Sequence, residues 1–417
     1  MSLDKIRAAL TRPNVGKSRV PVGHLARIPQ NGEGPTVIQV VRTYLPLTEN
    51  WIYDQVRHTE RYRSVFATKS AVANLSTFPF DPIYSVSKCP LHVRLLDREI
   101  RKRAGYSPYF SRLLDHERAG ILHAHGGGIA TFVVRSAHRS NVPMIVSFYG
   151  TDIWKHPEGE AGLRRKYADV FHLGELFLAE GPAAAAQLVR IGCPENRVVI
   201  HRLGVDVGAI PFKPRSLDNG AELKVLMASR FVEKKGIPYA IEGFCRVARD
   251  NPRIRLTVVG DTGSSKDRHF RKEIEKAVRQ HGVADQITIL GFMGREQLRE
   301  LADQHHILLH PSIKATTGDS EGGHPVVMTM LAASGVPILA TRHCDIPEIV
   351  RNGETGWLVA ERSADEIESV LRSIVRNPSM LIRFGIAARK LVETKYDIRT
   401  MRLDSIYDRV LPGARGG

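Results

Sequence analysis

Short apolar runs alternate with amphipathic helical stretches along most of this chain, and the alternation runs through twice. The β-like runs of the first half lie at 35–42, 63–68, 119–125 and 143–150, with helical stretches such as 51–62 and 129–138 between them. Those of the second half lie at 223–230, 255–261, 286–292, 306–312, 336–342 and 356–360, with helices such as 236–249, 271–280 and 364–376. Such alternation predicts parallel sheets covered on both faces. We therefore expect an α/β fold of two doubly wound, Rossmann-like domains, facing across a cleft that meets the carboxyl ends of the strands.

The length of 417 residues also suits two domains. We expect a basic flexible arm at 1–34, a first domain at 35–211 and a linker at 212–222, where turn-forming residues gather. The second domain should span 223–394. The remainder, 395–417, should be a C-terminal helix packing back towards the first domain, followed by a tail. Another helical tail is indicated from 379 to about 410.

The chain carries a formal net charge of +16, which favours a phosphate-bearing partner: nucleic acid, anionic lipid or a diphosphate ligand. One basic concentration lies in residues 1–30. A second comprises Arg94, Arg98, Arg101, Lys102 and Arg103, and is followed by Tyr106, Tyr109 and Phe110. Cations followed by aromatics are typical of a surface that rests on lipid headgroups, although a solvated helix face would read alike. No nucleic-acid-binding module is recognisable, which argues against nucleic acid as the partner.

No apolar run approaches the roughly 18 residues of a spanning helix, and the first residues lack the pattern of a secretory signal. We therefore expect a cytoplasmic protein, peripheral on the inner membrane face. The four cysteines form no Cys-x-x-Cys pair, so buried free thiols are expected in place of a zinc site or disulfide framework. His123 and His125 alternate as metal ligands can, but no third ligand at suitable spacing is apparent.

Charged residues and glycines gather at strand ends of the second half. Arg230 ends one predicted strand, and Lys235 and Gly236 follow at the start of a helix, where cations and backbone N–H groups can grip a diphosphate. About 80 residues later the loop Asp319-Ser-Glu-Gly-Gly precedes another helix. Its glycines allow close approach of an anion, whereas Glu321 is suited to accept hydrogen bonds from sugar hydroxyls or to balance a cation.

Taken in order, these segments resemble family 4 retaining glycosyltransferases of the GT-B fold. The resemblance rests on Ser229-RFVEKKG, the Asp319-x-Glu-Gly loop and Asp345-IPEIVRNGETGWLV in the second half. The first half contributes Leu45-PLTENWIYDQV, His123-AH, Ser147-FYGTDI and Leu203-GVD. It covers residues 36–395, and within the family the chain resembles the branch typified by colanic-acid-type exopolysaccharide transferases.

The resemblance implies retention of anomeric configuration, no bound metal and a UDP- or GDP-linked sugar held by the second domain. Arg230 and Lys235 match the family's diphosphate-binding pair, and Glu321 matches the first acid of its Glu-x7-Glu pattern. Tyr149 and Asp152 match the catalytic loop on the acceptor side. The remaining donor-side residues implied are Gly236, Gly322, Gly323, His324, Thr329 and Met330, and the acceptor side comprises Thr48, Glu49, His123, His125 and Gly126.

The chain departs from the family pattern at two places. Tyr149 stands where many members have histidine; a tyrosine can still donate or accept a hydrogen bond. The second acid of the Glu-x7-Glu pattern falls on Thr329 by strict counting, or on Met330 when aligned on Pro325 and Gly335. Neither is a carboxylate, so the clamp on the nucleotide ribose is missing.

The leading hypothesis is transfer of a hexose from a nucleotide-diphosphate sugar to a cell-envelope glycan or polyprenol-linked acceptor. Two alternatives stay open: a glycosyltransferase acting on a soluble secondary metabolite, and a non-catalytic protein that binds nucleotide sugars.

Overall fold

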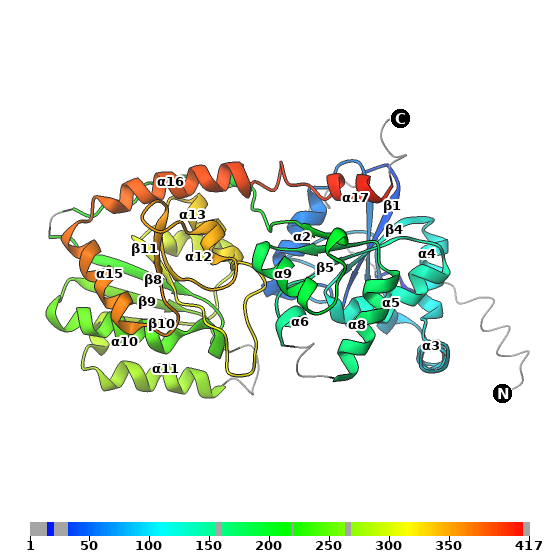
Figure 1. Ribbon diagram of the computed structural model, residues 1–417, viewed down its shortest axis with the longest axis horizontal. Coiled ribbons are helices and arrows are strands. Elements are labelled where there is room, and N and C mark those ends of the chain that lie inside the picture. Colours follow the sequence, from blue (N-terminus) through cyan, green and yellow to red (C-terminus); the bar gives the residue numbers. More distant parts are fainter. Residues whose placement is uncertain (1–14, 21–31, 156–160, 219, 263–267, 412–417) are drawn as a thin grey trace, which may run out of the picture. The chain divides into compact units, whose positions relative to one another are not determined.

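The structure is a computed structural model that describes residues 15–20, 32–155, 161–218, 220–262 and 268–411. The chain divides into two compact units. The first consists of residues 1–180, 185–201 and 401–417, and the second of residues 181–184 and 202–400. Each unit contains a parallel sheet with helices on both faces (Figure 1). Two Rossmann-like domains were predicted from the alternating pattern, and this fold class is confirmed.

The sheet of the first unit has seven strands in the order β3-β2-β1-β4-β5-β6-β7. The strands are β1 (Thr36–Val41), β2 (Arg63–Thr68), β3 (Ile83–Ser85), β4 (Ala119–His125), β5 (Met144–Ser147), β6 (Leu176–Ala179) and β7 (Val198–Ile200). The helices along this part of the chain are α2 (Asn50–Arg57), α3 (Leu91–Ala104), α4 (Pro108–His116), α5 (Gly127–Arg139), α6 (Thr151–Trp154), α8 (Ala161–Leu173) and α9 (Pro182–Arg190), and α17 (Asp404–Val410) returns from the far end of the chain.

Every residue of the central strand β1 is buried, as expected for a parallel strand covered on both faces. Its Val37 and Val41 pack in a core that also takes Leu403, Ile406 and Tyr407 from near the C-terminus. Because all strands run parallel, the loops after β1, β2, β4 and β5 leave from one edge of the sheet. That edge carries the acceptor-side residues predicted from the sequence.

The second unit has six parallel strands in the order β10-β9-β8-β11-β12-β13. They are β8 (Leu223–Ala228), β9 (Ile254–Val259), β10 (Ile287–Leu290), β11 (Ile307–His310), β12 (Ile338–Thr341) and β13 (Gly356–Val359). The helices are α10 (Ile237–Asp250), α11 (Arg268–Gln280), α12 (Arg295–Ala302), α13 (Val326–Ala333), α14 (Ile346–Ile349), α15 (Ala364–Arg376) and α16 (Met380–Lys395).

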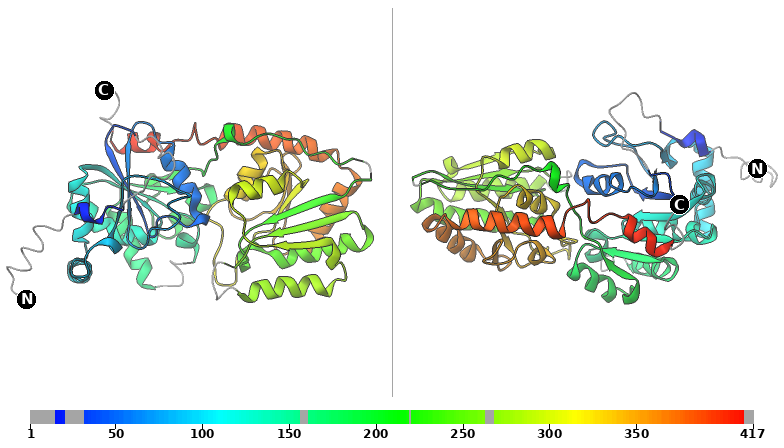
Figure 2. Two further views of the ribbon diagram at one scale, coloured as in Figure 1. Left: turned by 180° about the vertical axis from the view of Figure 1, so that it is seen from behind. Right: turned by 90° about the horizontal axis from the view of Figure 1, so that it is seen from above.

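Two hydrophobic cores lie on the two faces of this second sheet. Val225 of β8 points to the core shared with α10, α11 and α15, whereas its neighbour Leu226 points to the core shared with α12, α13 and α16. The alternation follows from the two-residue period of a strand. The same layering can be followed from behind and from above (Figure 2).

The structure places the boundary between the units at Arg202, ahead of the 212–222 segment predicted as the linker. Residues after 201 belong with the second unit because Val205 pairs with the segment after α16: its N–H donates to Tyr396 O at 2.9 Å, and its carbonyl accepts from Ile398 N at 3.0 Å. The same pairing interrupts the helical tail predicted from 379 to 410, which forms α16 and α17 as separate helices.

Most of the predicted N-terminal arm lies outside the described residues. Its described part is folded: Val15–Ser18 form a 3-10 turn, and buried Val20 donates its N–H to Ile83 O at 2.8 Å. The prediction that Tyr109 and Phe110 lie on a lipid-facing surface beside the basic cluster is wrong. Tyr109 and Phe110 are buried because α4 turns its apolar face to the core.

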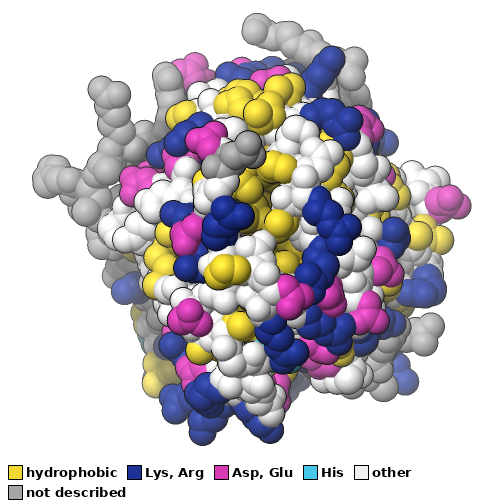
Figure 3. Space-filling model, turned by 90° about the vertical axis from the view of Figure 1, so that its left-hand side faces the viewer, with side chains coloured by type: hydrophobic (Ala, Val, Ile, Leu, Met, Phe, Trp, Pro, Cys, Tyr) yellow, Lys and Arg dark blue, Asp and Glu magenta, His cyan; other side chains and the backbone are white. Residues whose placement is uncertain are grey.

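No helix in the described ranges is both long and apolar enough to cross a bilayer. On the second unit, basic and acidic side chains lie interspersed on the face seen in Figure 3. Helices α10 and α15 show the pattern in detail: Arg246 pairs with Glu242 and Asp365, and Arg372 pairs with Asp250 and Glu368. The positive charges of these helices are largely compensated by neighbouring acids.

Candidate functional site

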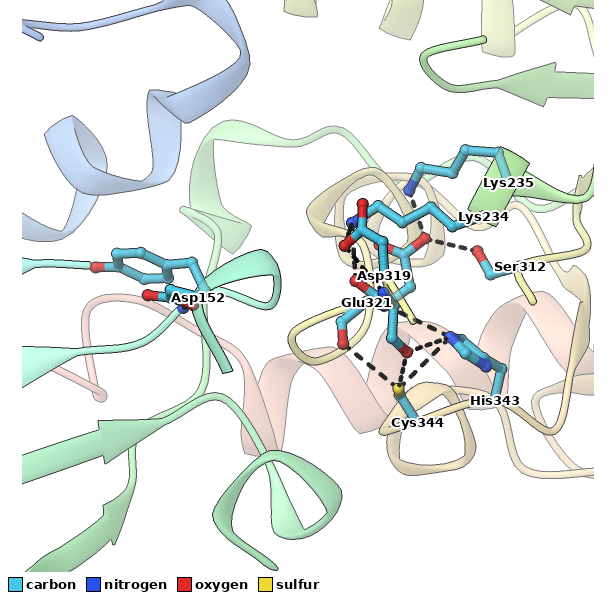
Figure 4. A network of polar contacts seen from close by, with 10 residues as sticks. Asp152, Lys234, Lys235, Ser312, Asp319, Glu321, His343 and Cys344 are labelled. Carbon is cyan, nitrogen blue, oxygen red and sulfur yellow. Dashed lines mark hydrogen bonds and ion pairs between the residues drawn. The ribbon is translucent and has the colours of Figure 1, made fainter. Parts of the chain in front are cut away.

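In the second unit, the loops after β8 and β11 approach each other at a glycine. Gly236 separates the short 3-10 turn Glu233–Lys235 from α10 and has φ of +59°. A Cβ atom there would lie 2.0 Å from Pro311 O, so only glycine permits this approach. The close approach places Lys235 beside Ser312 and Glu321 (Figure 4).

Lys235 and Glu321 form a buried ion pair. Lys235 Nζ lies 2.6 Å from Glu321 Oε1, and Ser312 Oγ donates to the same oxygen at 2.8 Å. Burial is the largest influence on both groups and opposes both charges. In Glu321 the attraction of Lys235 and Lys234 outweighs burial and holds the pKa well below its usual range. In Lys235 burial outweighs the attraction of Glu321 and lowers the pKa.

Arg230 is exposed, and its charge adds to the lowering of the Lys235 pKa. An exposed guanidinium and a buried ammonium thus both lie after the same strand, β8. This combination of cations suits a diphosphate. The structure brings Lys235, Gly236 and Glu321 together, and Arg230 acts on Lys235 through its charge.

Lys234 was not anticipated from the sequence, yet it holds the loop after β11. Its Nζ donates to Ser320 O at 2.8 Å and lies 3.3 Å from Asp319 Oδ1. Glu233 accepts from Thr316 N at 2.7 Å. Consecutive residues of one turn therefore pin both the middle and the end of the loop that carries Glu321.

Residues after β12 support the same loop from the other side. His343 Nδ1 lies 2.7 Å from Glu361 Oε1, and its Nε2 lies 2.9 Å from Ser320 Oγ. Since a carboxylate only accepts, Nδ1 donates to Glu361, and because the Glu321 N–H also points at Nε2 at 3.5 Å, we infer that Nε2 accepts from the Ser320 hydroxyl. Glu361 in this way sets the tautomer that binds Ser320.

Cys344, expected as a buried spectator thiol, also contacts this loop and is only partly buried. Its Sγ lies 2.9 Å from Ser320 Oγ and donates to Glu321 O at 3.4 Å. Its φ of +47° is a left-handed conformation that costs a non-glycine residue about 1 kcal/mol or more. The other cysteines are also free thiols; Cys193 and Cys245 are buried.

His310 lies at the end of β11 and was not among the predicted site residues. Its ring is buried, and its Nε2 has no hydrogen-bond partner among the described residues. Burial, followed by the charge of Lys235, lowers its pKa to about 3. A neutral, unpaired imidazole nitrogen beside the ion pair is available to a ligand. The adjacency of β11 and β12 in a parallel sheet is the signal that could have pointed to this set.

The residues predicted around the second acid position make other contacts. His324 Nε2 lies 2.8 Å from Thr329 Oγ1, which occupies the Thr329 hydroxyl. Met330 belongs to the apolar core beneath α13. Gly322 and Gly323 precede this helix, which begins at Val326 after Pro325. Positions 329 and 330 thus carry a hydroxyl and a thioether in place of the expected acid.

In the first unit, Asp152 joins the loops that follow β4 and β5. Its Oδ1 accepts from Tyr149 N at 3.0 Å and its Oδ2 accepts from Gly127 N at 2.9 Å. A carboxylate at the start of α5 is also favoured by the helix dipole. Asp152 thereby holds Gly126 and Tyr149 at one edge of the sheet.

The sequence predicts that His123 and His125 line the acceptor side, but both rings are buried inside the first unit. His125 Nδ1 lies 2.7 Å from Tyr149 Oη and its Nε2 lies 3.0 Å from Gln39 Oε1. His123 is bonded to Tyr407 Oη at 3.0 Å and to Ser147 Oγ at 2.8 Å. Burial lowers the pKa of His125 to about 3, so this ring is neutral.

The polarity of this network follows from Gln39. Its Nε2 donates to Ser64 Oγ at 3.2 Å and to Tyr407 Oη at 2.9 Å, so its Oε1 must accept from His125 Nε2. His125 Nδ1 then accepts from the Tyr149 hydroxyl. We infer that the Tyr149 hydroxyl donates its hydrogen bond to His125 and can only accept hydrogen bonds from a substrate.

Thr48 and Glu49 lie in the 3-10 turn Leu47–Glu49, just before α2. Trp51 connects this segment to the strand-end loop, because its ring packs edge-on against Tyr149 with ring centres 5.8 Å apart. The described residues include no group of three or more His, Cys, Asp or Glu side chains that could hold a metal ion.

Comparison with known proteins gives two adjoining domain matches. Residues 57–208 match the family "Glycosyltransferase Family 4", and residues 211–391 match "Glycosyl transferases group 1". Curated relatives include the amylovoran biosynthesis glycosyltransferase AmsK of Erwinia amylovora, 27% identical over 269 residues, which are 64% of either chain. The putative colanic acid biosynthesis glycosyltransferase WcaL of Salmonella typhimurium is 30% identical over 261 residues, 62% of either chain. The matched region spans about three fifths of the length of these relatives.

Solved structures agree on the fold. The Anabaena protein Alr3699/HepE, crystallised in complex with UDP, superimposes with a TM-score of 0.74 at 14% identity, over 91% of this chain and all of that one. The lipopolysaccharide outer core galactosyltransferase WaaB superimposes with a TM-score of 0.66 at 12% identity, over 91% of this chain and 99% of that one. The chain therefore consists largely of a Glycosyltransferase Family 4 domain followed by a Glycosyl transferases group 1 domain, and the solved structures show that it has the GT-B fold.

Proposed function

We propose that this protein is a retaining glycosyltransferase of exopolysaccharide or lipopolysaccharide synthesis. It transfers a hexose from a UDP- or GDP-linked sugar to a cell-envelope glycan or polyprenol-linked acceptor, without a metal, in the cytoplasm at the inner membrane face. The observation that carries the proposal is the buried Lys235–Glu321 pair beside Arg230, at the strand ends of the second unit. The names of the AmsK and WcaL relatives support the pathway.

The pair explains how the donor would be held and released. Lys235 and Arg230 neutralise the charge of the diphosphate. When the Lys235 ammonium turns from Glu321 to the phosphate, the Glu321 carboxylate is free to accept hydrogen bonds from hydroxyls of the donor sugar. The bond from the anomeric carbon to the phosphate oxygen breaks as the acceptor oxygen bonds to that carbon on the same face. The acceptor proton passes to the leaving phosphate, whose charge the two cations stabilise.

Arg230→Ala and Lys235→Ala test this assignment. Each substitution should cost roughly 2–4 kcal/mol of transition-state stabilisation. The thermal unfolding midpoint of Arg230→Ala should stay near that of the wild type. UDP and GDP affinities by calorimetry, and hydrolysis of their sugar conjugates, are the measurements. Lys272→Ala, an exposed cation on α11, is the matched control. Wild-type turnover in both site variants would remove the donor-site assignment.

A non-catalytic nucleotide-sugar-binding protein is the second candidate. The engaged hydroxyl of Thr329 and the apolar setting of Met330 motivate it, because a ribose clamp is absent there. Donor hydrolysis without acceptor would exclude this candidate. Tight donor binding with neither hydrolysis nor transfer to any envelope or soluble acceptor would favour it.

A further inference from the structure

Four cations of the first unit lie close enough to Lys69, itself one of them, for their charges to act on it. Arg42 directly follows β1 and Lys69 directly follows β2, while Arg101 comes from α3 and Lys166 from α8. Lys69 and Arg101 lie over the ring of Phe132 in α5. Arg42, Lys69 and Lys166 are exposed, and Arg101 and Phe132 are half-buried. Solvent therefore reaches the cluster.

Two of these cations contact the same ring. Lys69 Nζ lies 4.5 Å from the centre of the Phe132 ring, and Arg101 Cζ lies 4.4 Å from it. Arg101 Nε is buried and has no hydrogen-bond partner among the described residues. An aromatic ring attracts a cation only modestly, so the Phe132 ring compensates little of the repulsion between Lys69 and Arg101.

The cluster contains no compensating acid in the described part of the chain, where none of Arg42, Lys69, Arg101 and Lys166 forms an ion pair. Elsewhere in the same unit cations are paired, as Arg63 is with Glu117 at 2.7 Å. Burial lowers the pKa of Lys69, and the charges of Arg101, Arg42 and Lys166 lower it further. Like charges held together without a counterion destabilise a fold, and such an arrangement is typical of an anion site.

The position of the cluster agrees with a ligand site. Arg42 and Lys69 leave the sheet at the carboxyl ends of adjacent strands, and Ser70 N donates to Arg42 O at 2.9 Å to join the two loops. Gly126 and Tyr149 leave the same edge after β4 and β5. Ligands of parallel α/β sheets bind at this edge.

We propose that Arg42, Lys69, Arg101 and Lys166 form a phosphate-binding site for the acceptor, which therefore carries a phosphate or diphosphate ester. This inference rests on the proposed transferase function and adds the chemical class of its acceptor. Guanidinium groups bind phosphate oxygens in bidentate fashion, and the ammonium groups supply the remaining charge. Of the basic residues on α3, the proposed site includes the half-buried Arg101 but not Arg98 and Lys102, which are exposed.

A soluble prenyl diphosphate of ten carbons is the probe, titrated calorimetrically in the presence of saturating UDP so that the donor site is filled. The double variant Lys69→Gln/Arg101→Gln should weaken its binding about tenfold or more. The matched control Arg98→Gln/Lys102→Gln, also a loss of two cations, should bind it within about twofold of wild type. Equal weakening in both pairs, or none in the first, overturns the proposal.

Two further measurements complete the test. Without the probe, Lys69→Gln should unfold at the same temperature as wild type or higher, because repulsion is relieved; a lower temperature would mean that the cluster only stabilises the fold. Binding to anionic phosphatidylglycerol vesicles tests the alternative that these cations only contact lipid headgroups. In that case Arg98→Gln/Lys102→Gln should bind the vesicles more weakly than Lys69→Gln/Arg101→Gln does, and Lys69→Gln/Arg101→Gln should bind the prenyl diphosphate as wild type does. That pair of results would also overturn the proposal. UDP and GDP binding are read separately: the absence of both sinks the transferase function, whereas binding of either with unchanged probe binding in Lys69→Gln/Arg101→Gln sinks only this site.

Discussion

At the scale of single residues, the donor-side chemistry depends on two opposite charges that neither water nor a distant counterion stabilises. Glu321→Gln keeps the shape of the side chain but leaves the Lys235 ammonium buried without its partner. We expect a loss of about 3 kcal/mol in the free energy of unfolding at neutral pH. The pKa of Glu321 is depressed in the folded state, so its contribution is fully present above the ordinary glutamate pKa of about 4.3 and is lost as the pH falls below it.

Urea unfolding of wild type and variant between neutral pH and about pH 3 measures this dependence. The gap between the two proteins should narrow as the pH falls. The double variant Glu321→Gln/Lys235→Met is the control, and should recover part of the loss because no unpaired charge remains. A gap that stays constant across the range would show that the pair contributes no titrating charge.

His343 permits a finer test, because two amides mimic its two nitrogens. Glutamine can reach Ser320 as Nε2 does, whereas asparagine can reach Glu361 as Nδ1 does. We expect His343→Asn to weaken UDP binding by about 1–2 kcal/mol and His343→Gln to rescue most of it. Calorimetry gives the affinities, and thermal unfolding shows whether both variants remain folded. Equal losses would mean that contact with Ser320 does not position the loop.

At the scale of elements, helix α13 decides what a restored acid would do. Met330 is buried in the core that α13 shares with α12 and α16. Met330→Glu should therefore destabilise the protein by roughly 3 kcal/mol, since the new carboxylate has no partner there. Met330→Leu is the control and should cost under about 1.5 kcal/mol. Thermal unfolding and UDP calorimetry are the readouts; tighter UDP binding in a stable Met330→Glu protein would show that the side chain reaches the ribose.

Elements with long periodic signals were predictable from the sequence, and short ones were not. The predicted strand 63–68 and helix 364–376 coincide with β2 and α15. β3 has three residues, too few for a recognisable pattern. In the candidate site, Lys235 and Glu321 were indicated by their places in loops that follow strands and by the family resemblance. The roles of Lys234 and His343 did not, because they depend on how the loops after β8, β11 and β12 meet in the folded sheet.

At the scale of the whole molecule, the first unit is built from separated parts of the chain. Tyr407, on α17, reaches back to the sheet that begins with β1: its hydroxyl accepts from Gln39 at 2.9 Å and lies 3.0 Å from His123 Nδ1. Tyr62 also packs edge-on against its ring. The folding of the first unit therefore depends on residues that follow the second unit in the chain.

Tyr407→Phe tests this dependence, because it removes one hydroxyl and leaves Gln39 and His123 buried with unmet hydrogen bonds. We expect a loss of roughly 2–3 kcal/mol confined to the first unit. Trp51 and Trp154 lie in that unit and Trp357 in the second, so Trp357→Phe leaves a fluorescence signal from the first unit alone, and the converse pair of substitutions isolates the second. In denaturant, Tyr407→Phe should shift only the transition of the first unit, whereas the exposed Ser405→Ala on the same helix should shift neither. If both transitions move together, the two units unfold as one, and α17 then stabilises the second unit as well as the first.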